Sequence, residues 1–92
     1  MEITYDPSKN LTNIAQRGLS FDQVKDLDWT QVWMFEDGRK NYGEIRYIAY
    51  APMNDRLYAF CFTRTELGLR VISFRKANKR EVNGYEQRAN DK

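Results

Sequence analysis

The residues best suited to chemistry are basic ones gathered in one short stretch. Between positions 64 and 80 only Glu66 is acidic, and it stands among Arg64, Arg70, Arg75, Lys76, Lys79 and Arg80. Guanidinium and ammonium groups bind phosphate and stabilise negative charge that develops on it. Just beyond, Glu81 and Tyr85 are four residues apart, so they share one face if the segment is helical. The stretch predicts a surface for a polyanion, and a merely solvated charged surface is the alternative.

Charge is also unevenly distributed over the whole chain. Residues 1–63 carry seven basic and nine acidic side chains, a net charge of −2, whereas residues 64–92 carry eight and four, a net charge of +4. An acidic N-terminal part and a basic C-terminal part again favour a basic surface that binds a polyanion.

Several absences exclude whole classes of chemistry. The 92 residues include no histidine, so histidine-based acid–base catalysis, histidine-containing triads and histidine zinc sites are excluded. The single cysteine, Cys61, excludes a cysteine-rich metal site and an internal disulfide, and no glycine-rich phosphate-binding loop is present. We therefore expect no metal and no cofactor.

Length and hydropathy predict a single domain over residues 1–92. No run of 18 apolar residues suggests a membrane span, and the N-terminal residues lack the pattern of a secretory signal. With only one cysteine, the composition fits the reducing cytoplasm, so we expect a cytoplasmic protein without membrane contact.

The N-terminal third predicts a short strand and two helices. Residues 2–5 alternate as in a strand, and Asp6 followed by Pro7 is a typical helix start. Gly18 should end this helix in a left-handed conformation. Its apolar face is formed by Leu11, Ile14 and Ala15. Ser20, with Gln23 three residues later, predicts a capped second helix that buries Phe21 and Val24.

The rest of the chain predicts four strands and a last helix. Alternating segments lie at residues 31–35, 46–51, 56–64 and 69–75, separated by turns. Asn78 and Glu81 form a second capping pair, which predicts a helix to about Arg88 and a frayed tail over residues 87–92. Short connections favour antiparallel pairing, so we expect an α+β fold with a four-stranded antiparallel sheet.

Alternation also divides the sheet into two faces. The bulky side chains of one strand, Tyr58, Phe60 and Phe62, should lie under the helices, opposite its small ones, Ala59, Cys61 and Thr63. On the next strand, Val71, Ser73 and Arg75 should share one side, and Ile72 and Phe74 the other. Pairing the two polar sides would leave a shallow basic floor that an RNA backbone could approach, although a slip of one residue would invert it.

Several motifs of the sequence resemble those of one family, the BrnT-type toxins. They are Asp6-Pro7-Ser8-Lys9 with Asn13, Arg17-Gly18-Leu19-Ser20-Phe21, Gly43-Glu44-Ile45-Arg46-Tyr47, Thr63-Arg64, Arg70-Val71-Ile72-Ser73-Phe74-Arg75-Lys76-Ala77, and Glu81 with Tyr85. The chain departs from the family pattern at Arg17, where histidine is usual, at Ile45 and at Phe74. If the family's histidine does chemistry, Arg17 puts activity in question; if it only packs the helix end, arginine can replace it.

The resemblance implies a RelE-like α+β fold and the toxin of a type II toxin–antitoxin pair. It implies a metal-independent endoribonuclease, neutralised by a BrnA-type antitoxin that carries a ribbon-helix-helix domain. Operator DNA would be reached only through that antitoxin. A homodimer and a toxin–antitoxin heterotetramer are both compatible with the sequence. The rival hypothesis is a non-catalytic protein of the same fold that binds RNA or a protein partner.

RNA cleavage needs a base, an acid and positive charge on the phosphorane, which gives the basic cluster definite roles. Arg75 and Arg64, at the ends of neighbouring strands, are predicted to meet around the scissile phosphate. Glu81 is the candidate general base or only a helix cap. Tyr85 could stack a base or donate a proton, or else pack in the core.

The remaining basic residues are candidate RNA contacts. Lys76, Lys79 and Arg80 are predicted to touch the RNA backbone, with a solvated surface as the alternative. Arg46 and Arg70 either reach RNA or pair with Glu44 or Glu66. Three large aromatic residues are expected in the core or at a surface for the antitoxin: Trp29, Trp33 and Phe35.

Overall fold

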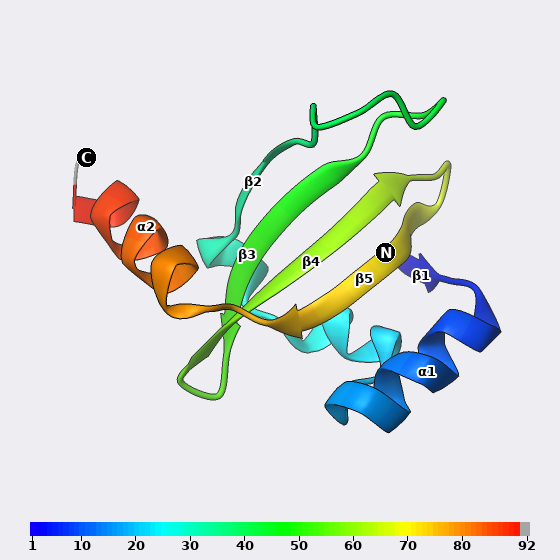
Figure 1. Cartoon of the computed structure of the whole chain (residues 1–92), viewed down its shortest axis with the longest axis horizontal. Helices are drawn as coiled ribbons and strands as arrows, with labels where there is room; N and C mark the ends of the chain where they lie inside the picture. The colour runs from blue at the N-terminus through cyan, green and yellow to red at the C-terminus, as the bar shows by residue number, and fades with distance from the viewer. Residues whose placement is uncertain (91–92) are drawn as a thin grey trace.

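The computed structural model describes residues 1–90, which form an α+β fold as predicted (Figure 1). In chain order the elements are β1 (Glu2–Thr4), α1 (Pro7–Arg17), the 3-10 helices η1 (Phe21–Asp26) and η2 (Trp29–Gln31), β2 (Trp33–Glu36), β3 (Tyr47–Met53), β4 (Arg56–Arg64), β5 (Gly68–Lys76) and α2 (Lys79–Asn90).

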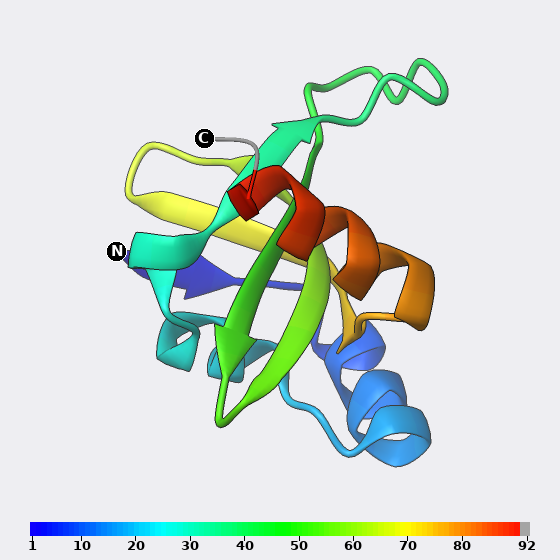
Figure 2. The ribbon, with the colours of Figure 1, turned by 90° about the vertical axis from the view of Figure 1, so that its left-hand side faces the viewer.

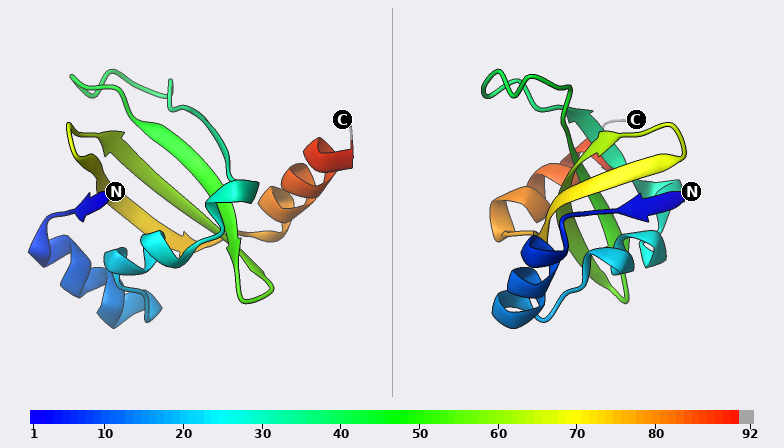
Figure 3. Two further views of the ribbon diagram at one scale, coloured as in Figure 1. Left: turned by 180° about the vertical axis from the view of Figure 1, so that it is seen from behind. Right: turned by 90° about the vertical axis from the view of Figure 1, so that its right-hand side faces the viewer.

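The sheet has five strands rather than the four predicted, in the order β1-β5-β4-β3-β2. All neighbours are antiparallel except β1, which pairs in parallel with the start of β5, so the sheet is mixed. Both views in Figure 3 show β1 alongside β5. Gly68 permits this pairing, because a Cβ atom there would stand 2.1 Å from the backbone oxygen of Glu2. The prediction missed the pairing because the strand has only three residues and its partner is far along the chain.

Local signals position the N-terminal helices as predicted. The Asp6 side chain accepts a hydrogen bond from the backbone N–H of Ser8, and Gly18 ends α1 with a φ of 69°. At the start of η1, Ser20 and Gln23 form the full capping box. These short-range contacts depend on neighbouring residues only, which is why the sequence reveals them.

Several element ends differ from the prediction. Strand β2 begins at Trp33 rather than at residue 31, because Trp29–Gln31 form the 3-10 helix η2, which was not predicted. Strand β3 continues through Pro52 to Met53, and the β3–β4 hairpin turns at Asn54 and Asp55, whose φ angles are 51° and 64°. Such positive angles suit the two-residue turns that match the twist of a hairpin. Helix α2 continues to Asn90, so residues 87–90 of the expected frayed tail are helical, and the last two residues lie outside the described part of the chain.

The hydrophobic core lies on one face of the sheet. Phe60, Phe62 and Phe74 are almost fully buried there, against the apolar side of η1. Trp29 also packs on this face, with edge contacts to Phe60 and Phe62. Helix α2 packs at one end of the opposite face, and Figure 2 shows it in front of the strands while α1 and η1 lie below. The bulky side of β4 therefore lies under the N-terminal helices, as predicted, but α2 packs on the other face, which the prediction did not foresee.

Helix α1 turns its polar face, not its apolar one, toward the sheet. Leu11 and Ile14 are 67% and 42% exposed, and Ala15 is exposed as well, so the apolar face identified from the sequence is turned to solvent. Asn13 is buried instead, and its side-chain amide donates to the backbone oxygens of Leu19 and Phe74 at 3.0 and 2.9 Å. The helix is fixed by hydrogen bonds to backbone carbonyls that would otherwise be buried without a partner.

A β-bulge in β5 changes which of its side chains share a face. The register with β4 shifts between Cys61 and Phe62, leaving Ile72 as the extra residue. Val71 therefore faces the core together with Phe74, contrary to the prediction. The predicted pairing of the polar sides is confirmed, since Ser73 lies opposite Cys61 and Arg75 lies opposite Ala59. Because a bulge puts two residues opposite one, strict alternation fails across it.

Candidate functional site

The end of β5 and the start of α2 hold an arginine–carboxylate pair. Arg75 leaves β5 toward the open face of the sheet, the face not covered by η1. The capping box at the start of α2 turns Glu81 back toward it: the Glu81 N–H donates to the Asn78 side chain, and the Asn78 N–H donates to Glu81 Oε1. Arg75 Nη1 and Nη2 then donate to the two carboxylate oxygens of Glu81 at 2.7 and 2.9 Å. The cap thus orients the carboxylate, and the carboxylate orients the guanidinium.

Tyr50 on β3 completes this cluster. Its buried hydroxyl donates to Glu81 Oε2 at 2.9 Å, although 31 residues separate the two along the chain. Burial, and then the bond to Glu81, raises the pKa of Tyr50. The hydrogen bonds from Arg75 are the main cause that lowers the pKa of Glu81 to about 2. Four hydrogen bonds occupy the two carboxylate oxygens, which is about all that their lone pairs can accept.

A small cavity of about 100 Å³ opens beside this cluster. Its floor is made of small side chains, among them Ala59, Cys61 and Ser73. The side chain of Arg75 is 39% exposed, and two of its five N–H groups have no partner within residues 1–90. Burial raises the pKa of the Cys61 thiol, which leaves it protonated and poorly reactive. The cavity offers an incoming anion a fixed, partly free guanidinium.

The loop between β2 and β3 brings a second arginine to this cavity. Asp37 is buried and accepts bonds from the side chain and backbone N–H of Arg39 and from the Tyr42 hydroxyl. These bonds, Arg39's first, hold the pKa of Asp37 well below its usual range. Arg39 lines the cavity with Arg75. Neither Arg39 nor Tyr50 was singled out from the sequence, because only the folded sheet brings them to Arg75.

Arg46 and Arg70 lie on the same open face and pair with one carboxylate. Arg70 Nη2 donates to both oxygens of Glu44, at 2.9 and 2.7 Å, and Arg46 lies 4.0 Å from the same carboxylate. Arg46 also stacks on the Tyr42 ring, 4.1 Å from its centroid. Of the two carboxylates considered from the sequence, the structure therefore selects Glu44 over Glu66.

Arg64 does not meet Arg75, contrary to the prediction. Strands β4 and β5 are antiparallel, so their C-terminal ends lie at opposite ends of the ladder: Ala59 is opposite Arg75, and Arg64 is opposite Leu69. The Arg64 guanidinium stacks on Tyr47 instead, 5.0 Å from its ring centroid. The prediction placed two strand ends together without considering the direction of the strands.

The other candidates surround α2 without entering the cavity. The Tyr85 hydroxyl donates to the backbone oxygen of Gln31, and its ring packs beside Leu57 and Tyr50. Tyr85 therefore fastens α2 to the sheet, the packing role considered from the sequence. Three basic residues are exposed at the β5–α2 junction: Lys76, Lys79 and Arg80.

Two aromatic residues of β2 extend the open face. Trp33 and Phe35 lie opposite Tyr50 and Ile48, and ring centroids in the group of Trp33, Phe35 and Tyr50 are 5.4 to 6.3 Å apart. Phe35 is exposed, and the Arg88 guanidinium covers Trp33 at 5.4 Å. Of the three aromatic residues considered for a core or a partner surface, only Trp29 belongs to the main core.

A sequence model described as the ribonuclease toxin, BrnT, of type II toxin–antitoxin systems matches residues 5–81. The chain belongs to this family. The match includes the BrnT signature segments and the Arg75, Tyr50 and Glu81 cluster, and it ends before Tyr85. A search of curated proteins found no match.

Membership of the BrnT family implies an antitoxin partner and a ribonuclease activity. Within residues 1–90, no three histidine, cysteine, aspartate or glutamate side chains form a group that could hold a metal ion. In the same part of the chain no helix is long and apolar enough to cross a membrane.

Proposed function

We propose that this protein is a metal-independent endoribonuclease toxin that cuts RNA in the cytoplasm and arrests growth. The RNA 2′-hydroxyl would lose its proton to solvent and attack the adjacent phosphorus. The 5′-oxygen would leave and take a proton from solvent, giving a 2′,3′-cyclic phosphate and a 5′-hydroxyl. The observation that carries the proposal is Arg75, fixed by Glu81 at a cavity of the open face with N–H groups left for a phosphate. The α+β arrangement also fits the RelE-like fold that the resemblance implies.

Arg75 would stabilise the charge that develops on the phosphorane oxygens. A donor fixed in advance costs little reorganisation at the moment of reaction, and one such donor contributes about 3 kcal/mol to transition-state stabilisation. Arg39, which lines the same cavity, would supply further positive charge.

For Glu81 we propose a positioning role in place of general base. Both of its oxygens are occupied by Arg75, Tyr50 and the Asn78 N–H, so it has no free lone pair for a 2′-hydroxyl proton. Its low pKa also makes it a weak base. The sequence suggested Tyr85 as the tyrosine that acts beside Glu81, but the tyrosine hydroxyl that contacts Glu81 is that of Tyr50.

The open face would bind RNA as a shallow platform. Small residues in the floor of β4 let a backbone approach closely, and the exposed Phe35 ring beside Trp33 offers a surface on which bases stack. Arg46 and Arg70, together with Lys76, Lys79 and Arg80, would contact flanking phosphates. Glu44 holds the first two in place until RNA binds.

For the partner we propose a BrnA-type antitoxin with a ribbon-helix-helix domain, through which alone the complex would bind operator DNA. Support comes from the family, whose description names a toxin–antitoxin system. Co-purification with the product of a neighbouring antitoxin gene, and loss of cleavage in the complex, would test this pairing.

The proposed activity is tested with purified protein and end-labelled RNA in excess EDTA. We expect cleavage to survive chelation, and Arg75→Gln to slow it about 100-fold or more, as loss of one transition-state donor does. Glutamine retains a hydrogen-bonding partner for Glu81, so it disturbs the fold less than alanine. Arg64→Gln is the matched control, with the same charge change at the other end of the β4–β5 ladder, and it should cleave at nearly the wild-type rate.

Intact RNA with folded wild-type protein would favour the rival hypothesis of a non-catalytic binding protein. A second arm, with ribosomes and messenger RNA, separates that outcome from a nuclease that works only on translating ribosomes. Growth arrest that disappears with Arg75→Gln and persists with Arg64→Gln would support catalysis in the cell.

The pH dependence of cleavage tests the role given to Glu81. The chain has no histidine that could titrate between pH 5 and 8. The pKa of Glu81 is lowered to about 2, so this carboxylate should not titrate in that range either. We expect a rate that does not pass through a bell-shaped maximum in this range. An acidic limb near pH 5 to 6 that disappears in Glu81→Gln would restore the general-base hypothesis.

A further inference from the structure

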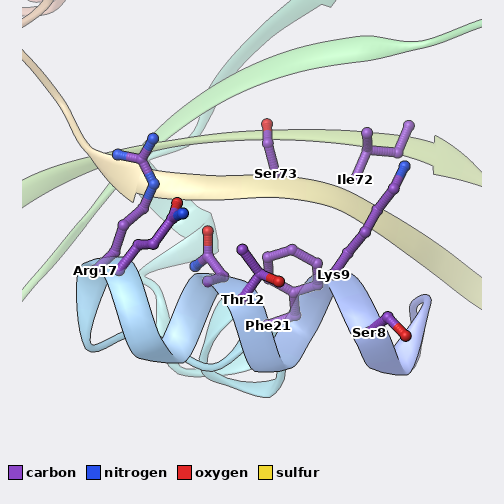
Figure 4. A pocket seen from close by; sticks show the side chains of 9 residues that line it. Ser8, Lys9, Thr12, Arg17, Phe21, Ile72 and Ser73 are labelled. Carbon is purple, nitrogen blue, oxygen red and sulfur yellow. The ribbon is translucent and has the colours of Figure 1, made fainter.

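A second groove runs between α1 and the outer edge of β5. It has a volume of about 350 Å³, and Figure 4 shows Lys9 and Arg17 rising from α1 past β5 on either side of Ser73. In this view the Ile72 and Ser73 side chains both point away from α1, on the side of β5 toward which Lys9 and Arg17 extend. The groove is therefore open at the edge of the sheet, with two long cationic side chains along it.

The groove exists because β1 is short. Strand β1 ends at Thr4, which pairs with Arg70, so beyond Arg70 the outer edge of β5 has no neighbouring strand in residues 1–90. Helix α1 crosses this edge and is fastened there through Asn13, which donates to the Phe74 oxygen. In a regular strand, the neighbouring side chains of Ile72 and Ser73 would point to opposite faces. The bulge at Ile72 lets both of them line the groove.

The chemistry of the lining favours an anion. Lys9 and Arg17 are exposed, and among residues 1–90 no carboxylate lies within ion-pairing distance of either. The other polar lining residues are neutral hydrogen-bonding groups, and none is acidic: Ser8, Thr12, Asn13, Gln16 and Ser73. The two cationic side chains and the neutral polar lining therefore favour binding of a phosphate group, and they would repel a positively charged ligand.

Ser73 joins this groove to the cavity of Arg75. It lines both, and along a strand it stands about 6.6 Å from Arg75, two residues at about 3.3 Å each. We propose that the α1–β5 groove binds the phosphates of single-stranded RNA next to the one that Arg75 holds. This inference rests on the proposed function. Arg17 then has a role of its own, as a backbone-binding residue at the family's histidine position.

Binding should be independent of base sequence, since the cationic residues that reach the groove recognise charge. The test uses a single-stranded RNA whose 2′-hydroxyls are methylated, so that it cannot be cut, and measures binding by fluorescence anisotropy from low to moderate salt. For single strands, each phosphate contact contributes about 0.7 to the slope of log affinity against log salt. Removing both cations in Lys9→Gln/Arg17→Gln should lower that slope by about 1.4.

Two matched variants sharpen the test. Lys25→Gln/Arg56→Gln removes the same charge from exposed positions elsewhere and should leave the slope unchanged. Lys9→Arg/Arg17→Lys keeps the charge and should also bind with the wild-type slope. Thermal unfolding of all three establishes that each variant is folded.

The proposal is overturned if Lys9→Gln/Arg17→Gln binds RNA with the wild-type slope. If that variant instead loses affinity for the antitoxin alone, the groove receives an acidic protein segment and the RNA assignment is wrong. Wild-type protein that binds RNA through Lys9 and Arg17 but cuts neither free RNA nor messenger RNA on ribosomes would leave the groove assignment standing and refute the proposed nuclease. The two failures are therefore distinguishable.

Discussion

The two faces of the central strands are built from alternate residues of the same chain segments. On one face Phe60, Phe62 and Phe74 fill the space under η1 and are almost completely buried. On the other, Ala59 and Cys61 leave a shallow floor beside the Arg75 cluster. One face supplies stability through apolar area, and the other keeps charged groups oriented through hydrogen bonds.

The charged face is held in place by hydrogen-bond networks, whereas the core is held by apolar packing. Glu81 accepts four hydrogen bonds and Asp37 is buried among its donors, so the two arginines they bind are held near the cavity. Such networks are worth little when exposed and much more when partly buried. Substitutions on the two faces should therefore have separable effects, on stability for one and on activity for the other.

The largest expected effect on stability belongs to the core face. Phe60→Ala should lower the free energy of unfolding by about 4 kcal/mol, because it removes a fully buried ring and leaves a cavity. Chemical denaturation measures it, with Cys61→Ala, the next residue on the opposite face, as the control. If both variants lost equal stability, the two faces would not differ in the way described.

Next in size is the polar attachment of α1. Asn13→Ala should cost about 3 kcal/mol, because two backbone oxygens lose their buried donor. The neighbouring exposed Thr12→Ala should change the free energy of unfolding little. Equal effects at the two positions would show that α1 is held mainly by something other than Asn13.

A smaller effect concerns acid stability on the open face. The folded-state pKa of Glu81 is lowered from 4.5 to about 2, so its contribution is complete above pH 4.5 and disappears as pH falls toward 2. After allowance for the exposure of Arg75, this is about 2 kcal/mol. The loss of unfolding free energy between pH 7 and pH 2 should be smaller by roughly that amount in Glu81→Gln.

Glu86→Gln is the matched control for that measurement, since Glu86 is exposed on the same helix. It should retain the wild-type dependence on pH. If Glu81→Gln kept that dependence as well, other carboxylates such as Asp37 would account for the acid sensitivity.

Local patterns in the sequence were enough to predict much of the fold. The caps at Asp6, Ser20 and Asn78 involve residues two or three positions apart, and β4 was predicted at its observed bounds. The pairing of β1 with β5, and the bulge at Ile72, depend on residues far along the chain or on the backbone of a partner strand. Alternation alone carries no such information.

Helix α1 shows how an apolar pattern can mislead. Leu11 and Ile14 have the spacing of a buried stripe, yet both are exposed. The helix lies over an unpaired strand edge, whose backbone oxygen at Phe74 needs a donor, and Asn13 provides one. The need to satisfy a backbone group decided which face turns inward.

The candidate site was predictable where its residues are close in sequence. Arg75 and Glu81 are six residues apart on either side of a cap, and both were identified. Tyr50 and Arg39 come from another strand and a loop, so no spacing rule indicates them. Arg64 was misplaced because strand direction, not position at a strand end, decides which ends meet.

The parallel pairing of β1 has a consequence for the time at which the molecule becomes whole. Strand β1 leaves the ribosome long before its partner at residues 68–70. The hydrogen bond from Asn13 to the Phe74 oxygen likewise cannot form until Phe74 has been synthesised. At about 5 to 20 residues per second, several seconds of translation separate these segments. Arg75 and Glu81 are themselves in the late segment, so the nascent chain carries no assembled site while most of its own message is being read.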